Sequence, residues 1–406
     1  MQSVERRLGA SRVKASTPQA GSEYSPSMRI ALIHDWLDTW AGGEHCLAQI
    51  LALYPHAELF ALVDFLPDDL RTRIGGRHAR TTFLQRLPGA RKRFRQFLPL
   101  FPRAIESLDV SGFDLVISSS HAVAKGVRTH KRQLHICYCY SPIRYAWDLR
   151  DQYLRQVGLE HGVRSWLVRR VLDRIQRWDR ATSARVDHFV AISRRIADRI
   201  ERCYGRSSSI IYPPVDLPIT PPAEHERRSY VTVSRLVPYK RIDLIAAAFR
   251  ELPDRELVVI GEGPERSRIE AAAGPNVRLL GQVTDIERDA WLARARAFVF
   301  AADEDFGIAP LEAQGWGTPV IAYGRGGATE TIRGQDEAAP TGVFFDVQTP
   351  EAIAATVRRF EASADHISAG ACRANADRFA ASRFRAEFAS FVETRHAEFA
   401  ACGASR

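Results

Sequence analysis

Short apolar runs alternate with helical patterns along the first half of the chain. Runs of Val, Ile and Leu that are bounded by helical patterns are typical of parallel strands covered on both faces. A helix is predicted from about Gly43 to Leu53, after a loop with Trp and Gly residues that follows the first of these runs. The candidate strands are Arg29–His34, Ala57–Leu62, Asp114–Ser118, Gln133–Tyr140 and His188–Ile192. The pattern therefore predicts an α/β unit built on a parallel sheet.

The alternation restarts after a proline-rich stretch. Five prolines fall within residues 213–222, and because proline fixes φ and removes a backbone donor, this stretch is expected to be an extended connector. The later candidate strands are Tyr230–Ser234, Glu256–Ile260, Val277–Leu280, Ala297–Ala301 and Pro319–Ala322. Helical patterns follow at about Lys240–Leu252, after Pro264, at Ile286–Arg294 and at Gly307–Gly315. Two consecutive Rossmann-like, doubly wound α/β domains are predicted.

These patterns give an expected domain organisation. Phe384, Phe388, Phe391 and Val392 stand at helical spacing near the end of the chain and predict a packing helix there. The expected segments are a disordered leader at 1–27, an N-terminal domain at 28–212, a Pro-rich linker at 213–226, a C-terminal domain at 227–380, and a packing helix with a tail at 381–406. Because ligands of such sheets bind beyond the carboxyl ends of the strands, the site is expected between the two sheets.

Composition narrows the class of protein. The chain has 406 residues, of which 45% are hydrophobic and 26% charged, as in ordinary globular proteins. No run approaches the ~20 apolar residues of a membrane-spanning helix, and the first residues have no apolar segment typical of a secretion signal. The six cysteines are scattered without a metal-ligand spacing. We expect a cytoplasmic protein in a reducing compartment, with no metal and no other cofactor.

Charge is divided unevenly between the two halves. Up to Pro213 there are 34 lysines and arginines against 20 acidic residues, and beyond it 23 against 28. A basic half suits nucleic acid, an anionic membrane surface or an acidic substrate, and charge alone does not choose among them. Residues 91–103 interleave cations with aromatic and aliphatic side chains. That segment suits docking on an anionic bilayer, and an ordinary solvated helix face is the alternative.

Two cations follow the first strand of the second unit. Arg235 and Lys240 stand between that strand and the next helix. Free N–H groups and the helix dipole favour an anion at this position, so a cation pair here suits a bound diphosphate. The alternative is a pair of solvated surface cations.

Two glutamates surround the start of the predicted helix at Gly307–Gly315. Glu304 lies in the loop before it and Glu312 lies on it, with seven residues between them. A partly buried carboxylate needs donors, and a sugar diol supplies two, while the amides of Gly307, Ile308 and Ala309 would face the same ligand. Alternatively, Glu304 caps the helix and Glu312 pairs with an arginine.

Two further candidates come from the first unit. Gly42 and Gly43 lie in the turn after the first strand, where paired glycines let backbone approach a phosphate or sugar, or simply make a tight turn. His121 follows another strand and would suit polar catalysis, although many single histidines are structural. The acidic triplet at 303–305 looks like a D-x-D metal motif, but no second ligand cluster accompanies it.

Taken together, these segments resemble glycosyltransferase family 4, the group 1 type of retaining, nucleotide-sugar-dependent enzymes with the GT-B fold. The segments that carry the resemblance are AGGEH (41–45), VAISRRIADRIERCYG and IIYPPVD (within 190–216), SRLVPYKRIDLI (234–245) and EDFGIAPLEAQGWGTPVIAYGRGGATETI (304–332). The stretch YCYSPIRYAWDLRDQY (138–153) is similar to bacterial mannosyltransferases of O-antigen or exopolysaccharide synthesis. The chain departs from the family pattern at Arg241, where glycine is commoner.

The resemblance implies a role for each candidate residue. The expected donor-binding residues are Gly42, Gly43, Arg235, Lys240, Gly307, Ile308, Ala309 and Glu312, and the expected catalytic residues are His121 and Glu304. The implied reaction moves a sugar, with mannose from GDP-mannose as the first choice, to a lipid-linked or polysaccharide acceptor with retention. The acceptor side would be the basic half, at the inner face of the cytoplasmic membrane.

Two other function classes stay open from the sequence. A nucleotide-sugar epimerase or a phosphorylase would share the same architecture. A basic nucleic-acid-binding protein would explain the charge of the first half, but no nucleic-acid-binding motif is present, so no nucleic acid is expected as a partner.

Overall fold

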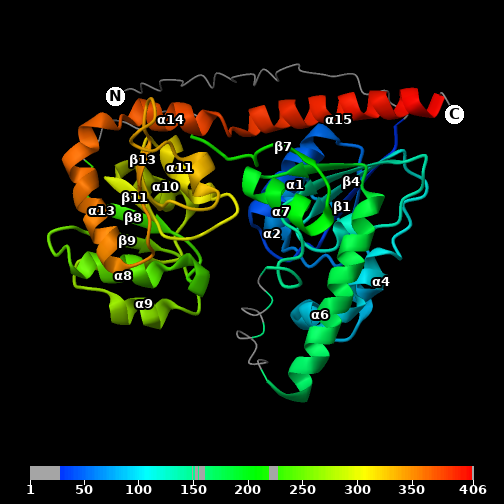
Figure 1. Cartoon of the computed structure of the whole chain (residues 1–406), viewed down its shortest axis with the longest axis horizontal. Helices are drawn as coiled ribbons and strands as arrows, with labels where there is room; N and C mark the ends of the chain where they lie inside the picture. Colours follow the sequence, from blue (N-terminus) through cyan, green and yellow to red (C-terminus); the bar gives the residue numbers. More distant parts are fainter. Residues whose placement is uncertain (1–27, 149, 151–153, 155–160, 219–226, 405–406) are drawn as a thin grey trace, which may run out of the picture.

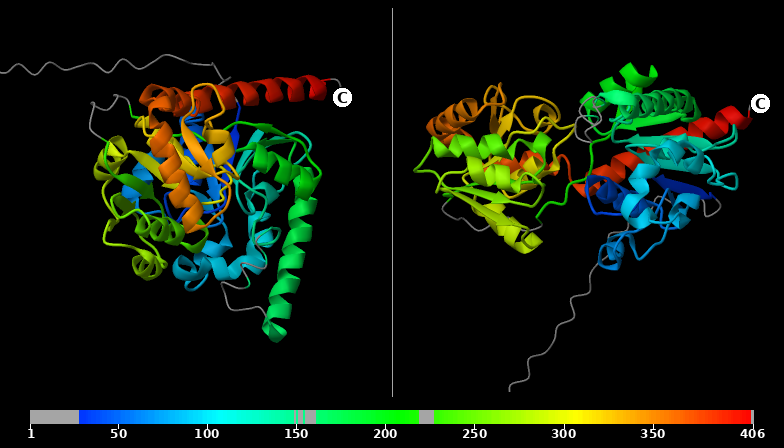
Figure 2. Two further views of the ribbon diagram at one scale, coloured as in Figure 1. Left: turned by 60° about the vertical axis from the view of Figure 1, so that its left-hand side comes forward. Right: turned by 90° about the horizontal axis from the view of Figure 1, so that it is seen from below.

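The computed structural model describes residues 28–148, 150, 154, 161–218 and 227–404 (Figure 1). The expected leader and residues 219–226 of the expected linker lie outside the described residues. Two parallel sheets with interleaved helices make up the fold, as predicted from the alternation of strand and helix patterns. Figures 1 and 2 show the two sheets in separate domains that lie side by side.

The first sheet has seven strands in the order β3-β2-β1-β4-β5-β6-β7. Every described strand pair in it is parallel. The order reverses between β1 and β4, so the turns after these two strands lie next to each other. The strands are β1 (Ile30–His34), β2 (Glu58–Ala61), β3 (Arg80–Thr81), β4 (Leu115–Ser120), β5 (Leu134–Cys139), β6 (His188–Ala191) and β7 (Ser208–Ile210).

The second sheet has six parallel strands in the order β10-β9-β8-β11-β12-β13, with its reversal between β8 and β11. The strand order thus reverses in the same way in both sheets. In each domain the loops that follow the two strands at the reversal lie side by side, and we call these two loops the turn pair. The strands are β8 (Tyr230–Val233), β9 (Leu257–Ile260), β10 (Val277–Gly281), β11 (Ala297–Phe300), β12 (Val320–Tyr323) and β13 (Gly342–Phe345).

Helices cover both faces of each sheet. The helices of the first domain are α1 (Gly42–Leu53), α2 (Asp68–Arg71), α3 (Ala90–Arg93), α4 (Phe101–Ile105), α6 (Gly162–Thr182) and α7 (Arg194–Tyr204). Those of the second are α8 (Ile242–Arg250), α9 (Arg266–Ala272), α10 (Asp285–Arg294), α11 (Ile308–Gly315), α12 (Ala328–Thr331), α13 (Pro350–Ser363) and α14 (Ala369–Asp377).

Burial on both faces explains the unbroken apolar strands. On β1, Leu32 packs in a cluster with residues of α1 and α7, whereas its neighbour Ile33 packs in a different cluster with residues of α4 and α6. Successive strand residues point to opposite faces. A strand covered on both sides therefore needs an apolar residue at every position.

The last helix returns to the first domain. Helix α15 (Ala381–Ala404) begins beside the second domain and runs along the first, as Figure 1 shows at the red end of the chain. Its Phe384 and Phe388 are fully buried in the core of the first domain, where Phe384 packs edge-on against Tyr138. The chain thus crosses between the domains twice, and the crossings touch where the N–H of Val215 donates to the carbonyl of Phe379 at 2.9 Å.

The structure adds elements that the sequence pattern did not single out. These include the long helix α6, the edge strand β13 and the helix α13. Residues 91–103 form short helical turns in which the cations are exposed, but Phe94 and Phe101 are buried in the core. None of the described helices is long and apolar enough to cross a membrane.

Candidate active site

The turn pair of the second sheet brings two of the predicted residues together. Lys240 lies in the short helical turn Pro238–Lys240 after β8, and Glu304 lies in the loop after β11. Because β8 and β11 are neighbours, these loops meet, and the Lys240 ammonium forms an ion pair with the Glu304 carboxylate. Glu304 does not cap the next helix, whose N-cap is Gly307.

Arg235 lies on the same loop but is more open to solvent. It is exposed, and its guanidinium donates to the hydroxyl of Tyr239 at 3.3 Å. Lys240 is held between the rings of Tyr239 and Phe300, at 5.6 and 6.0 Å from their centroids. The loop thus holds one half-buried cation that is paired with a carboxylate and one exposed cation that contacts a tyrosine hydroxyl.

The backbone conformation of Arg241 shows why glycine is commoner at this position in the family pattern. Arg241 has φ of 54°, in the left-handed region that glycine adopts at little cost. Its side chain reaches Asp243 at 3.6 Å. Glycine at this position would therefore fit the backbone better, and arginine is accommodated with some strain.

Helix α11 begins beside these residues and faces the other domain. Gly307 has φ of 91° at the N-cap, and the first amides of a helix, here those of Ile308 and Ala309, have no acceptor within it. A Cβ added to Gly42 would lie 2.9 Å from the Cδ1 atom of Ile308. The first turns of α1 and α11 therefore touch across the domains.

The two glycines of the first domain differ in what they face. Gly42 contacts Ile308 of the second domain, as above. A Cβ on Gly43 would lie 3.7 Å from His34 and 3.8 Å from Tyr140, both in its own domain. The hydroxyl of Tyr140 also donates to the Gly43 carbonyl at 2.9 Å. A side chain at Gly42 would thus meet Ile308 at close range, whereas one at Gly43 would make only ordinary van der Waals contacts.

Glu312 is half-buried on α11, four residues after Ile308. Burial raises the pKa of its carboxyl, and the positive charge of Arg288 only partly opposes this. Arg288 is itself held by Asp285 at 2.9 Å and Asp289 at 2.8 Å. Glu312 is thus a carboxylate whose charged form would gain from added hydrogen-bond donors.

His121 lies at the reversal point of the first sheet, beyond β4. Its Nδ1 is 3.0 Å from Asp35, which follows β1 and is fully buried. A carboxylate only accepts hydrogen bonds, so Nδ1 carries the proton and Nε2 is left with its lone pair. Burial lowers the pKa of His121, although Asp35 acts to raise it, and the ring of Trp36 packs edge-on at 4.5 Å.

Asp35 also holds the backbone that carries His121. Its two carboxylate oxygens accept from four consecutive amides, those of residues 121–124, at 2.5 to 2.9 Å. Four amides converging on one buried carboxylate satisfy its charge without a cation. The sequence did not single out Asp35, although an acidic residue directly after a buried strand at a reversal point was an available signal.

Behind His121 a second polar network was also missed. His34 is fully buried, with Nδ1 3.0 Å from the Ser119 hydroxyl and Nε2 3.5 Å from Glu44. Burial acts to raise the pKa of Glu44, but hydrogen bonding and charge from His34 outweigh it and hold that pKa below its ordinary value. Glu44 also accepts from the amide of Ala41 at 2.9 Å and so fixes the start of α1.

The two aspartates of the acidic triplet bind arginines of the first domain. Asp303 pairs with Arg195 at 2.6 Å, and Asp305 pairs with Arg199 at 3.0 Å and with Arg144. Among the residues that the structure describes, no group of three or more His, Cys, Asp or Glu side chains is placed to hold a metal ion. Asp303 and Asp305 therefore contact the first domain, whereas Glu304 between them contacts Lys240.

A second contact between the domains caps a helix. The carboxylate of Glu330 accepts from the amides of Arg194 and Arg195 at 2.8 and 3.2 Å, and from the hydroxyl of Tyr212 at 3.2 Å. A carboxylate at a helix N-terminus is stabilised by the free amides and the dipole. Glu330 of the second domain thus completes α7 of the first.

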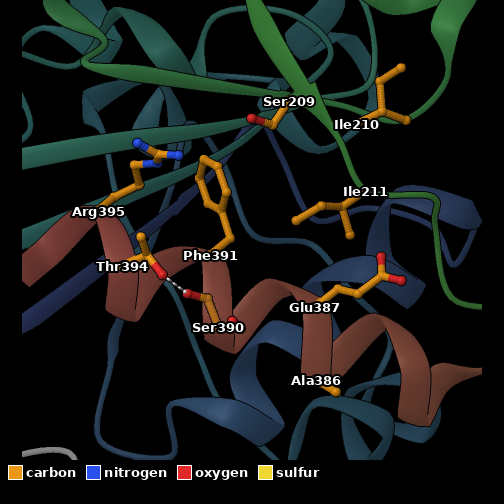
Figure 3. Close-up of a pocket in the computed structure, with 9 residues that line it drawn as sticks. All are labelled: Ser209, Ile210, Ile211, Ala386, Glu387, Ser390, Phe391, Thr394 and Arg395. Carbon is orange, nitrogen blue, oxygen red and sulfur yellow. Dashed lines mark hydrogen bonds between the residues drawn. The ribbon is translucent and has the colours of Figure 1, made fainter.

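One hollow of the described surface lies away from these residues. A groove of about 560 Å³ runs between β7 and α15, and Figure 3 shows its lining side chains. The lining residues are Ser209, Ile210, Ile211, Ala386, Glu387, Ser390, Phe391, Thr394 and Arg395. None of the predicted site residues takes part in it, so the candidate active site rests on the turn pairs and not on this groove.

Comparisons with known proteins agree with this arrangement. A sequence model described as "Glycosyl transferases group 1" matches residues 220–378, and one described as "Glycosyltransferase Family 4" matches residues 66–218. The two matches adjoin, and each falls on one of the two domains. Together they take in more than half of the chain.

Curated relatives match over shorter lengths. A phosphatidyl-myo-inositol mannosyltransferase from Propionibacterium freudenreichii is 41% identical over 91 residues, which are 21% of this chain and 22% of that protein. A GDP-mannose-dependent monoacylated alpha-(1-6)-phosphatidylinositol monomannoside mannosyltransferase from Corynebacterium glutamicum is 36% identical over 114 residues, 24% of this chain and 30% of that protein. The chain spans less than a third of the length of these two relatives.

A solved structure extends the likeness to the whole fold. HepE from Anabaena, solved in complex with UDP and glucose, superposes with a TM-score of 0.66 at 17% identity and covers 90% of this chain and 99% of that one. At this identity the likeness concerns the fold. With the fold and the two matched domains in agreement, the chain belongs to glycosyltransferase family 4, the group 1 type, and has the GT-B architecture.

Proposed function

We propose that this protein transfers a hexose from a nucleoside-diphosphate sugar to a lipid-linked or polysaccharide acceptor, with mannose from GDP-mannose as the first candidate. The observation that carries the proposal is the Lys240–Glu304 ion pair at the reversal point of the second sheet, beside the start of α11. Of the two relatives described above, one is named as GDP-mannose-dependent, and both are named for acceptors that carry phosphatidylinositol.

Lys240 and Arg235 would bind the donor diphosphate. In the structure Lys240 is occupied by Glu304, and a diphosphate carries more negative charge than one carboxylate. The diphosphate would take over Lys240, and the first amides of α11 would add donors without a metal ion. Glu304, released from Lys240, would then accept hydrogen bonds from hydroxyls of the sugar.

Glu312 would bind the ribose of the nucleotide. Its pKa is raised mainly because burial disfavours the charged carboxylate, and neighbouring aspartates add to this. A ribose offers two adjacent hydroxyls, each of which can donate to a carboxylate oxygen. Binding would therefore restore donors to a group that burial has left in need of them.

His121 would act on the acceptor side of the reaction. Asp35 fixes the proton on Nδ1, and burial favours the neutral ring. The remaining lone pair on Nε2 can accept a hydrogen bond from a hydroxyl of the sugar or of the acceptor. His121 is thus proposed as a group that orients a hydroxyl at the reacting carbon.

Retention of configuration is part of the proposal. The bond from C1 of the sugar to the phosphate oxygen breaks while a bond from C1 to the acceptor oxygen forms on the same face. The acceptor proton passes to the leaving phosphate oxygen, whose charge Arg235 and Lys240 stabilise. Glu304, which is paired with Lys240 in the structure, is not needed as a nucleophile in this scheme.

The cytoplasmic face of the membrane is the proposed location, since a lipid-linked acceptor has its headgroup there. The basic first domain supports it, because an excess of cations suits an anionic surface.

A donor screen with product analysis tests the proposed function. Nucleoside diphosphates and their sugars are tested as ligands by thermal shift, since a selective ligand raises the melting temperature by mass action. The best donor is then incubated with membrane lipid extract, and the glycolipid product is analysed by NMR for its anomeric configuration. Conversion of the donor without an acceptor would indicate an epimerase, and release of sugar phosphate on addition of phosphate would indicate a phosphorylase.

A further inference from the structure

Helix α6 presents an apolar end to solvent. Val163, Trp166 and Leu167 lie in its first two turns, with exposed fractions of 76%, 55% and 52%. Each of them is more than half exposed, which few large hydrophobic residues of the described chain are. In Figures 1 and 2 one end of α6 projects away from the first sheet. Val163, Trp166 and Leu167 belong to that end, because they lie in the first turns of the helix.

The same face of α6 continues as a row of cations. Arg170, Arg174 and Arg177 are exposed and follow Trp166 and Leu167 at spacings of three, four and seven residues. Residues at these spacings lie on one side of a helix. The outer face of α6 is therefore apolar at its tip and basic behind it.

Acidic groups on this helix do not cancel the basic row. Asp173 is bound by Arg150 at 2.7 Å, and Asp179 is buried with Lys125 at 2.7 Å. Arg170 packs on the ring of Trp166 at 5.1 Å, which places one cation directly beside the apolar tip. The row thus presents its positive charge outward.

The opposite face of α6 fixes the helix to the domain. Leu172 and Ile175 are buried, and the indole of Trp178 donates to Glu106, next to α4, at 2.9 Å. The exposed residues are therefore held on a rigid element and cannot fold back into a core. An apolar tip with a basic row behind it is the pattern of a helix that enters a bilayer interface, with the cations at the level of the headgroups.

We propose that the outer face of α6 docks on an anionic bilayer, with Val163, Trp166 and Leu167 entering the interface and Arg170, Arg174 and Arg177 contacting lipid phosphates. This assigns the membrane location of the proposed function to a different element from residues 91–103, whose Phe94 and Phe101 are buried. Vesicle binding tests this assignment without any transfer reaction. A loss of support for membrane docking would therefore leave the proposed transferase function unaffected.

Co-sedimentation with vesicles of phosphatidylcholine, with and without phosphatidylglycerol, tests the proposal. Replacing Val163, Trp166 and Leu167 with Ser, or the three arginines with Glu, is expected to lower partitioning onto the anionic vesicles by about tenfold or more. Two matched controls come from the second domain. In one, the exposed Ile286 and Val347 are replaced with Ser. In the other, the exposed arginines Arg250, Arg294 and Arg358 are replaced with Glu. The controls should bind as the wild type does, and melting temperatures check that all variants are folded.

Quenching by brominated lipid gives an independent readout. If Trp166 enters the interface, brominated vesicles quench part of the tryptophan emission of the wild type, and that part is absent in Trp166→Phe. Equal sedimentation of the tip variants and the wild type, or equal quenching in Trp166→Phe, would overturn the proposal. It would also be overturned if the arginine variant lost binding to a DNA duplex while its vesicle binding stayed normal.

Discussion

The ammonium group of Lys240 is paired with the carboxylate of Glu304, although the two residues follow different strands and are far apart in the sequence. Each is an expected ligand of a different part of the donor. Their pairing means that a carboxylate occupies the position where the diphosphate is proposed to bind. Donor binding is then an exchange of one anion for another on the same cation.

Replacing Glu304 with Gln tests this exchange. The substitution keeps the shape of the side chain but removes the anion that competes for Lys240, so binding of a nucleoside diphosphate should stay equal or become severalfold tighter. Sugar transfer should fall by about a hundredfold or more, because the carboxylate that accepts from the sugar is lost. Calorimetry with the diphosphate and a turnover assay measure the two effects, and parallel losses in both would contradict the exchange.

Asp305 is expected to hold the two domains together. Asp305→Asn should weaken the ion pairs with Arg144 and Arg199. Because the charge of the buried Arg199 would then be less well neutralised, the free energy of unfolding should fall by about 3 kcal/mol. Asp303→Asn is the matched control, since Asp303 pairs with Arg195 and is more exposed, and it should cost under about 1 kcal/mol. Urea unfolding measures both. A larger loss for Asp303→Asn than for Asp305→Asn would show that the assignment is wrong.

Asp35 is expected to be a positioning residue for His121. An asparagine cannot accept from all four amides and from the imidazole, so Asp35→Asn should lower the free energy of unfolding by about 2–4 kcal/mol. It should also change the pH profile of turnover, because Nδ1 of His121 no longer faces a carboxylate.

Asp109→Asn, at an exposed loop position, is the control and should change stability by less than about 0.5 kcal/mol. An unchanged pH profile in a folded Asp35→Asn variant would argue against a role for Asp35 in orienting His121.

His135 predicts a loss of stability in mild acid. It is fully buried, and burial lowers its pKa to about 4, with the Arg185 carbonyl near Nδ1 opposing the shift. In the unfolded chain the histidine has a pKa of about 6.5, so below that pH the unfolded chain binds a proton that the folded chain does not bind. Stability from this residue is therefore complete above about pH 6.5 and is lost as the pH falls toward 4.

Urea unfolding at pH 7.5 and pH 5 measures the contribution of His135. Between these values the wild type should lose about 2 kcal/mol more than His135→Gln does, since the variant has no imidazole to protonate. His56→Gln, at an exposed position, should follow the wild type. Equal losses in the wild type and in His135→Gln would contradict the assignment.

Much of the fold could be predicted because parallel strands covered on both faces leave unbroken apolar runs. The segment of β1 is an example, since Leu32 and Ile33 pack on opposite sides. Helix α6 was missed because its outer face carries exposed hydrophobic residues and arginines, which blur the helical pattern. Strand β13 was missed although it is as long as β8, β9, β11 and β12, which were predicted.

The candidate site was predicted less completely. Lys240 and Glu304 could be singled out because each follows a strand. Their ion pair depends on the strand order, which local patterns do not specify. The partners of Asp303 and Asp305 come from α7 and from the segment after β5, more than 100 residues earlier in the chain, and only the folded structure brings them together.

Binding of GDP and GDP-mannose in the presence of EDTA tests the central claim most directly, by calorimetry on the wild type, Lys240→Ala and the matched control Arg250→Ala. Arg250 is an exposed cation at the end of α8, the helix that follows Lys240. The account predicts that the wild type and Arg250→Ala bind in EDTA, whereas Lys240→Ala binds at least about tenfold more weakly. Equal affinity of Lys240→Ala and the wild type, or binding that requires magnesium or manganese, would contradict it.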